Sequence, residues 1–164
     1  MFYPLDFTFV CPTEIEALNK RVKDFKALNT EVLCVSVDSH YSHRAWASVD
    51  RKDGGFGGSL DIDLLSDLTK NISKDYGVLI EGAGLSLRGT FLIDKHQNLR
   101  HMSVNDNNVG RNMDEYVRLV GAFNYSEEHG ENCPATWQKK GDDTITGNHN
   151  DEKTKKYWTQ HLKK

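Results

Sequence analysis

Hydrophobic positions along the chain follow two different spacings, and the helical one is clearest near the N-terminus. From Pro12 to about Asn29 apolar residues recur at steps of three and four, which is typical of one buried face of an amphipathic helix. These residues are Ile15, Leu18, Val22, Phe25 and Leu28. An apolar, aromatic run precedes Cys11, and Pro12 suits the first turn of a helix. Cys11 is therefore predicted at a helix N-terminus, where unpaired backbone N–H groups favour a thiolate over a thiol.

Three segments of the chain have the composition of β-strands. Residues 31–38, EVLCVSVD, are apolar and β-branched without polar alternation until their end, which predicts a strand covered on both faces. Residues 85–94 and 99–104 flank the polar sequence KHQN and predict a hairpin. Arg88 lies in the middle of the first of these apolar strands. Because a guanidinium there needs an anionic partner or an edge position, we favour a role for Arg88 in a site over an exposed edge.

Helical spacing returns in three later segments of the chain. The segment Ser66 to Tyr76 predicts a helix with Leu68 and Ile72 facing inward, and residues 112–125 predict another. Residues 151–164 predict a terminal helix whose apolar side carries Tyr157, Trp158 and Leu162. The alternation of helices and strands favours an α/β sandwich with a mixed central β-sheet and helices on both faces.

A short helix and a glycine-dense loop complete this pattern. The segment 39–49 predicts a helix capped by Ser39 or Ser42, with Trp46 on its apolar side. The glycine-dense residues 53–59 lack the Lys-Ser/Thr ending and the preceding strand of a phosphate-binding loop. They predict a flexible hinge, because glycine tolerates unusual backbone dihedrals.

Length and charge narrow the class of protein. A chain of 164 residues has room for one domain, which we assign to residues 1–125, and the polar residues 126–164 predict an extended C-terminal tail. The net charge of −3 argues against nonspecific binding of nucleic acid. The chain contains no apolar run near the ~20 residues of a membrane helix and no signal-peptide pattern. These features predict a cytoplasmic protein that does not bind membranes.

The three cysteines are too few and too scattered for a disulfide framework. Cys34 lies inside a predicted strand, which favours an inert, buried side chain. Cys133 lies in an exposed-looking Asn-Cys-Pro context. His40 and His43 are close together but lack a third ligand of a suitable type, so no metal site is predicted.

Two charged residues, Glu14 and Arg111, each allow more than one interpretation. Glu14 follows Cys11 by three positions, where it can cap the helix start as in a capping box or orient an active-site cation. Arg111 stands just before a predicted helix, and a simple loop charge is one interpretation of it.

Taken in order, the segments FYPLDFTFVCPTE, SVDS, GGFG, LSLRGTFLID, VGR and ENCPATW closely resemble a typical 2-Cys peroxiredoxin over essentially the whole chain. The combination is specific, whereas each piece alone is weak. The resemblance implies a thioredoxin-like fold and an antioxidant thiol peroxidase that reduces hydrogen peroxide and organic hydroperoxides without a metal or organic cofactor. It begins just before the cysteine loop, so the chain is expected to be truncated relative to the family's first strands.

The resemblance also implies roles for individual residues around the first cysteine. Cys11 matches the peroxidatic cysteine, with Pro4 shielding it and Thr8 hydrogen-bonding the thiolate and the peroxide. Arg88 matches the active-site arginine of the family.

Further residues match supporting positions of the family. Glu14 looks like the carboxylate that holds the arginines, and Arg111 like the second arginine. Trp46 matches a residue that packs near the pocket, and Cys133 looks like the resolving cysteine, which the partner subunit contributes.

The implied partners are a thioredoxin-like reductant and a second copy of the chain, in a homodimer and possibly a ring of dimers such as a decamer. The sequence GGFG and the pair Tyr157-Trp158 stand where the family has features that promote overoxidation, which predicts sensitivity to excess peroxide. The alternative is a chaperone-type or redox-relay protein with little peroxidase turnover, because the sheet is expected to be incomplete.

Overall fold

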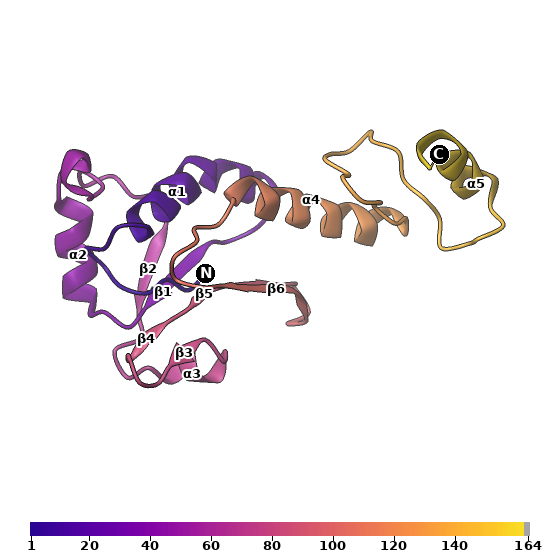
Figure 1. The fold of residues 1–164 in the computed structure, drawn as a ribbon. Helices are drawn as coiled ribbons and strands as arrows, with labels where there is room; N and C mark the ends of the chain where they lie inside the picture. Colours follow the sequence, from indigo (N-terminus) through magenta and orange to yellow (C-terminus); the bar gives the residue numbers. More distant parts are fainter. Residues whose placement is uncertain (163–164) are drawn as a thin grey trace. The chain divides into compact units, whose positions relative to one another are not determined.

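A computed structural model of the chain describes residues 1–162. These residues belong to two compact units, Met1–Met113 and 114–162 (Figure 1). In chain order the elements are α1 (Cys11–Ala27), β1 (Leu33–Ser36), α2 (His40–Ser48), the 3₁₀ helix η1 (Arg51–Asp53), β2 (Asp63–Ser66), α3 (Asn71–Asp75), β3 (Leu79–Ile80), β4 (Leu85–Ser86), β5 (Arg88–Ile93), β6 (Leu99–Asn105), α4 (Met113–His129) and α5 (Glu152–His161). The chain is therefore an α/β protein, as its pattern predicts.

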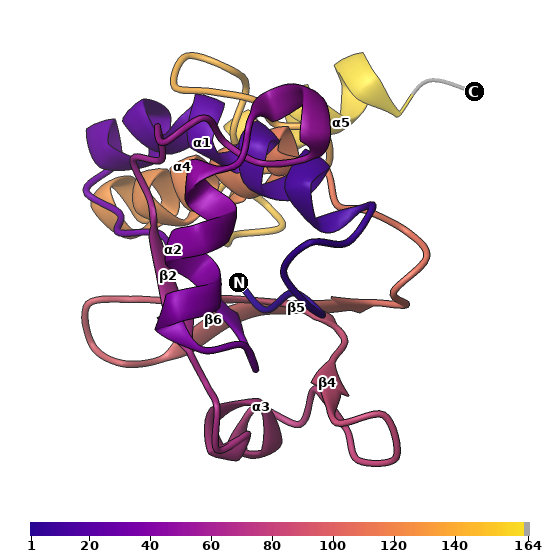
Figure 2. The same ribbon diagram turned by 90° about the vertical axis from the view of Figure 1, so that its left-hand side faces the viewer.

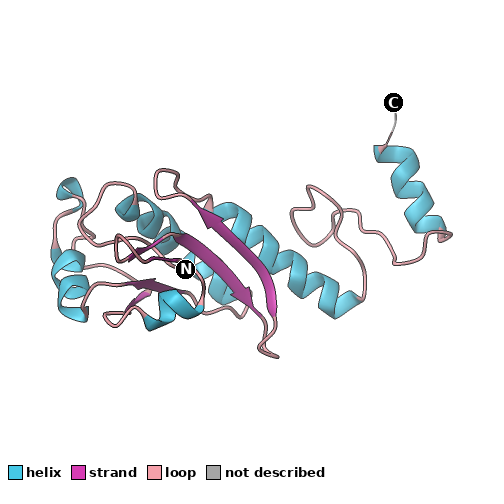
Figure 3. Ribbon diagram, turned by 60° about the horizontal axis from the view of Figure 1, so that its bottom comes forward, coloured by secondary structure: helices cyan, strands magenta, loops and turns pink. Residues whose placement is uncertain are grey.

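The strands of the first unit pair in twos. β1 and β2 are parallel, whereas β3 with β4 and β5 with β6 are antiparallel, and the β5–β6 pair is the long hairpin of Figure 3. The first residues of the chain connect two of these pairs. The N–H of Phe2 donates to Gly89 O in β5 at 2.7 Å, and the N–H of Tyr3 donates to Val35 O in β1 at 3.0 Å. Residues 1–3 thus lie between β1 and β5 and join parallel and antiparallel pairs.

A hydrophobic cluster surrounds this junction. Phe2, Val35 and Val78 are buried, and Leu65, Leu87 and Phe91 pack against them. The ring of Phe2 lies 5.7 Å from that of Phe91 in an edge-on contact. The helices α1 and α3 lie on opposite sides of the β5–β6 hairpin (Figures 1 and 2). The junction therefore forms part of the core from which the cysteine loop departs.

Most helices and the hairpin match the sequence prediction. The helix predicted from Pro12 begins one residue earlier, so that Cys11 is its first residue. The helix predicted at 39–49 is α2, and its cap is Ser39, whose hydroxyl accepts the N–H of Ser42. The hairpin predicted around KHQN is formed by β5 and β6.

The prediction for Ser66 to Tyr76 is wrong in its length and its buried face. Only α3 is helical there, and Leu68 and Ile72 are 64% and 38% exposed. The buried carboxylate of Asp67 accepts two backbone N–H groups at the start of α3 and so turns the chain. Lys70 has a left-handed backbone, φ 65°, which interrupts a continuous helix.

The second unit contains most of α4 and the terminal helix. α4 continues to His129, past the predicted end of its helix, and the predicted domain boundary after residue 125 falls inside it and remains a prediction. Asp151 caps α5 by accepting the N–H of Lys153. Leu162 follows α5 and is 69% exposed, so its predicted place on an apolar helix face is wrong. Residues 163–164 of the predicted terminal helix lie outside the described residues. Across 1–162, none of the helices is long and apolar enough to cross a bilayer.

Candidate active site

Cys11 occupies the N-terminus of α1 and is fully buried. The residue before it, Val10, is apolar and provides no side-chain cap for the helix. Pro12 follows in the first turn and has no N–H of its own. The positive end of the helix dipole therefore lies at the sulfur of Cys11, where it favours negative charge.

Arg88 provides a second source of positive charge at this sulfur. Its Nη1 donates to Cys11 Sγ at 3.4 Å and to Glu14 Oε2 at 2.7 Å. Its Nε and Nη2 donate to the backbone carbonyl of Asn107 at 3.0 and 2.7 Å. Since all three donor atoms are fixed, the buried guanidinium holds one N–H toward the sulfur, and such hydrogen bonds are strongest when the acceptor is ionised.

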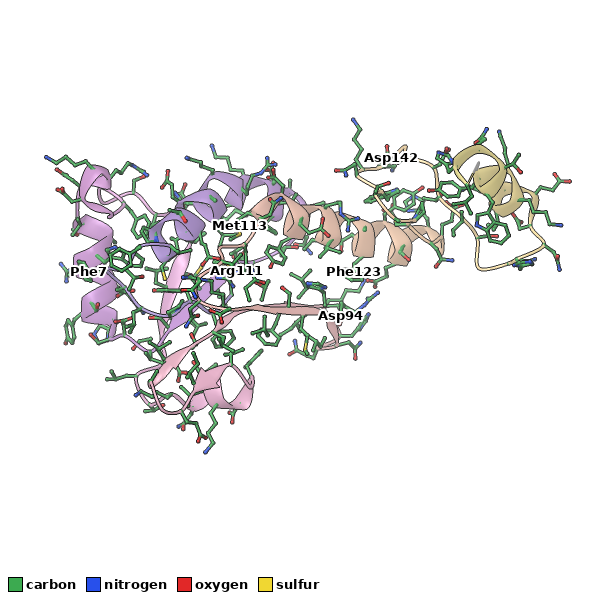
Figure 4. All side chains as sticks on the ribbon, viewed as in Figure 1. Phe7, Asp94, Arg111, Met113, Phe123 and Asp142 are labelled. Atoms are coloured by element: carbon green, nitrogen blue, oxygen red, sulfur yellow. The ribbon has the colours of Figure 1, made fainter. Side chains whose placement is uncertain are left out.

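Glu14 lies between two arginines. Its Oε1 accepts from the backbone N–H and from Nε of Arg111 at 2.9 and 2.8 Å, and its Oε2 accepts from Nη2 at 3.0 Å. Arg111, which Figure 4 labels, also donates through Nη1 to Gly89 O and Thr90 Oγ1. Glu14 thus contacts both arginines, and Arg111 is buried. The roles of Glu14 and Arg111 in the site remain predictions.

Pro4 and Thr8 belong to the loop that leads into α1. Pro4 is buried. The hydroxyl of Thr8 donates to Leu5 O at 2.8 Å, so it must leave this carbonyl before it can donate to a thiolate or a peroxide. Phe7 has a left-handed backbone, φ 56°, which is strained for an aromatic residue. The roles of Pro4 and Thr8 remain predictions.

Trp46 links this loop to the glycine-dense segment. It is buried in α2, and its Nε1 donates to Gly54 O at 2.8 Å. Its ring lies 4.7 Å from Phe56 and 6.1 Å from Phe7, which Figure 4 labels beside α2. At Gly55 an added Cβ would lie 2.2 Å from Val49 O, so only glycine fits there. The predicted hinge is thus anchored at its centre by a fully buried phenylalanine.

The other two cysteines lie in different surroundings. Cys34 is buried in β1, and burial raises its pKa to about 11, in agreement with an inert side chain. Cys133 belongs to the second unit, where its thiol donates to Ala122 O at 3.6 Å. Burial also raises the pKa of Cys133. All three cysteines have free thiols.

A buried network around Asp6 was not predicted from the sequence. Its carboxylate accepts from Tyr3 Oη at 2.8 Å and from Ser42 Oγ at 2.7 Å, and its Oδ2 lies 2.9 Å from His43 Nδ1. His43 and Asp6 are 37 positions apart, so no local pattern pairs them. The aspartate within the apolar sequence FYPLDFTF is the signal that could have marked this site. Within residues 1–162 no group of three potential metal ligands gathers.

The Asp6–His43 pair predicts a pH-dependent stability. Burial lowers the pKa of His43, but the hydrogen bond and the negative charge of Asp6 outweigh it, so the net shift is upward. The pair therefore stabilises the fold fully below the unfolded value near pH ~6.5 and progressively less as the pH rises through the folded pKa. As the pH rises from about 6 to about 8.5, the urea concentration at the midpoint of unfolding should decrease. It should decrease less in Asp6→Asn than in the parent. Ser42→Ala, which keeps the pair, is the control, and an equal pH dependence in all three would contradict this assignment.

Comparison with known proteins shows where this site belongs. Residues 1–102 match the model of the AhpC/TSA family, and residues 122–160 match that of the C-terminal domain of 1-Cys peroxiredoxin. The chain belongs to the AhpC/TSA family. The peroxiredoxin resemblance predicted from the sequence is thereby confirmed.

Individual peroxiredoxins resemble this chain closely. The "Thioredoxin-dependent peroxide reductase, mitochondrial" of Drosophila melanogaster is 56% identical over 160 residues, which are 98% of this chain and 68% of the relative. The human protein of the same name is 60% identical over 136 residues, which are 83% of this chain and 53% of the relative. This peroxiredoxin thus spans about half the length of its human relative. The reduced 2-Cys peroxiredoxin of Plasmodium vivax superposes with a TM-score of 0.82 at 46% identity, covering 87% of this chain and 72% of that one. The likeness confirms the thioredoxin-like α/β fold.

One prediction is corrected by these names. The expected cytoplasmic location is wrong on this comparison, because the fly and human relatives are both named mitochondrial. The net charge and the lack of long apolar runs bear on nucleic acid and membrane binding, but they do not distinguish one aqueous compartment from another.

Proposed function

We propose that this peroxiredoxin is a thioredoxin-dependent peroxidase whose reacting atom is the sulfur of Cys11. One observation carries the proposal. Arg88 Nη1 donates to Cys11 Sγ at 3.4 Å while the same nitrogen is held by Glu14, at the positive end of α1. A thiolate is favoured by both neighbours, and a thiolate is the nucleophile that peroxide chemistry needs.

The first step transfers one oxygen from the peroxide to the protein. The Cys11 thiolate attacks one peroxide oxygen, the S–O bond forms as the O–O bond breaks, and the leaving oxygen takes up a proton as water or an alcohol. Arg88 and the helix N-terminus stabilise the negative charge that develops on the leaving oxygen. Hydrogen peroxide and organic hydroperoxides share the O–O bond, so both are substrates of this chemistry.

The second step joins two subunits. Cys133 of a partner copy condenses with the Cys11 sulfenic acid, and a thioredoxin-like reductant opens the disulfide by thiol exchange. Because Cys11 is fully buried, the loop before it must first unfold locally, which the strained Phe7 and the exposed Phe9 in that loop favour. The names of the relatives support the reductant and a mitochondrial location. A homodimer follows from this step, and a ring of dimers is the further proposal.

The resolving step is tested with cysteine variants on a nonreducing gel. After a pulse of hydrogen peroxide, the parent should form a disulfide-linked dimer and Cys133→Ser should remain monomeric, because it lacks the second sulfur. Cys34→Ser, which changes a buried and inert thiol, should still form the dimer. A dimer that persists in Cys133→Ser and disappears in Cys34→Ser would show that the resolving residue is misassigned.

A further inference from the structure

The turn that carries Cys133 is docked on α4 of its own unit. Arg118, from α4, donates through Nη1 to the backbone carbonyl of Trp137 at 2.9 Å. The ring of Trp137 is buried and lies 5.4 Å from that of Tyr125, also on α4. Residues 133–137 are thereby held against the helix at both their ends, since the thiol of Cys133 donates to Ala122 O on the same helix.

Arg118 is itself held in a fixed orientation. Its Nε and Nη2 donate to the two carboxylate oxygens of Glu115 at 2.7 Å each, one turn earlier on α4. Such a bidentate pair fixes the plane of the guanidinium. The remaining nitrogen, Nη1, is the one that reaches the turn.

Arg118 and Cys133 are held at the same turn, so the charge of the guanidinium bears on the thiol. Burial raises the pKa of Cys133, and the nearby Arg118 opposes this shift, whereas Glu131 adds to it. The carbonyl of Ala122 accepts the thiol proton and so favours the neutral form. The guanidinium of Arg118, which reaches the turn from α4, favours the ionised form, and its own pKa is raised chiefly by Glu115.

We propose that Arg118 is the positioning residue of the resolving cysteine: it holds the 133–137 turn on α4 and stabilises the Cys133 thiolate as it attacks. This inference rests on the proposed function. Cys133 gives its proton to water, and its sulfur then forms a bond to the sulfur of the Cys11 sulfenic acid. The S–O bond of the sulfenic acid breaks, and hydroxide leaves and takes up the proton. The Cys133 sulfur is oxidised and the Cys11 sulfur reduced, so no other oxidant is needed.

One polar group of the docked turn lacks a hydrogen-bond partner, and this favours release of the turn. The indole Nε1 of Trp137 is buried without an acceptor among the described residues. When the turn leaves α4 this N–H reaches water, which favours release. The hydrogen bond from Arg118 to the Trp137 carbonyl is therefore an important restraint on the turn.

The test measures the ionisation of Cys133 in reduced protein. On a Cys11→Ser, Cys34→Ser background, alkylation by iodoacetamide reports Cys133 alone, and its rate is followed by mass spectrometry from about pH 6 to pH 10. Arg118→Gln should raise the pH midpoint and lower the rate at pH 7.5 by about two- to fivefold, the size expected for one partly exposed charge pair. Arg118→Lys should restore the midpoint, because it keeps the charge. Glu115→Gln should lower the midpoint, because it removes the counter-charge of Arg118.

Opposite shifts in Arg118→Gln and Glu115→Gln are the signature of charge, since release of the turn alone would expose Cys133, speed alkylation and lower the midpoint in both variants. An unchanged midpoint in Arg118→Gln, or shifts of the same direction in both, would overturn the proposal. If Arg118→Gln does not fold, the proposal is tested by Glu115→Gln alone, whose midpoint should shift downward. The measurement needs no peroxide, so it is independent of the proposed function. Failure of the unmodified chain to form a Cys11–Cys133 disulfide would instead contradict that function.

Discussion

The Cys11→Ser variant is expected to lose thioredoxin-coupled peroxide consumption down to the background rate. A serine hydroxyl is not ionised near neutral pH, so neither Arg88 nor the N-terminus of α1 has an anion to stabilise, and the S–O bond cannot form. The measurement is the oxidation of NADPH in an assay coupled through thioredoxin and its reductase, at saturating thioredoxin and with hydrogen peroxide as the substrate.

Cys34→Ser is a matched control for this variant. Both cysteines are fully buried in the same unit, and both substitutions replace a sulfur by an oxygen. A general loss of packing would lower activity in both variants, whereas the proposed chemistry predicts the loss in Cys11→Ser alone. Turnover that survives in Cys11→Ser would rule out Cys11 as the reacting residue.

The second large effect is expected for Glu14→Gln. Glu14 is the carboxylate that faces both Arg88 and Arg111, and all three side chains are buried. Removal of one partner from a buried ion pair typically costs about 3–5 kcal/mol, because the remaining charge is left uncompensated. We expect a loss of this order in the free energy of unfolding, measured in urea. A large fall in peroxidase activity should accompany it, because Arg88 loses the contact that aims Nη1 at the sulfur.

Glu16→Gln separates this effect from the change of a carboxylate to an amide on the same helix. Glu16 pairs with Arg51 and Lys20 at the surface, where ion pairs contribute about 0–1 kcal/mol. Its free energy of unfolding and its activity should stay close to those of the parent. If Glu14→Gln were as stable and as active as Glu16→Gln, the two arginines would not depend on Glu14.

The residues of the candidate site that the sequence could predict are those that violate a local pattern. Arg88 is a charge in an apolar strand, and Cys11 precedes a proline at the start of a periodic helix, so each is conspicuous without any tertiary information. Asp67 gives no such signal, because a short acidic side chain suits a loop as well as a buried turn. Its carboxylate accepts the N–H groups of Ile72 and Ser73 at the start of α3, and Leu68, which precedes this helix, is exposed.

Contacts made through the main chain are harder still to predict. Arg88 is fixed by the carbonyl of Asn107, a group that every residue carries and that no substitution pattern reveals. A pair of side chains that are distant in sequence is equally hard to predict. The pairing of Asp6 with His43 depends on how α2 packs against the loop. These contacts become predictable only once the fold is known.

The position of residues 1–3 between β1 and β5 sets a limit on the opening that exposes Cys11. Tyr3 is fixed to β1 through its backbone and to Asp6 through its hydroxyl, and the loop to Cys11 begins at the next residue. Opening can therefore spread backward from α1 as far as Phe7, but beyond that point it must break first the hydrogen bonds of Asp6 to Asp38 and Ser42 and then those that join the strand pairs. The N–H groups of Phe2 and Tyr3 should consequently exchange with deuterium as slowly as those of the core, while those of residues 7–9 exchange quickly. The reactive loop is thus a short flap that is anchored first at Asp6 and then at the sheet.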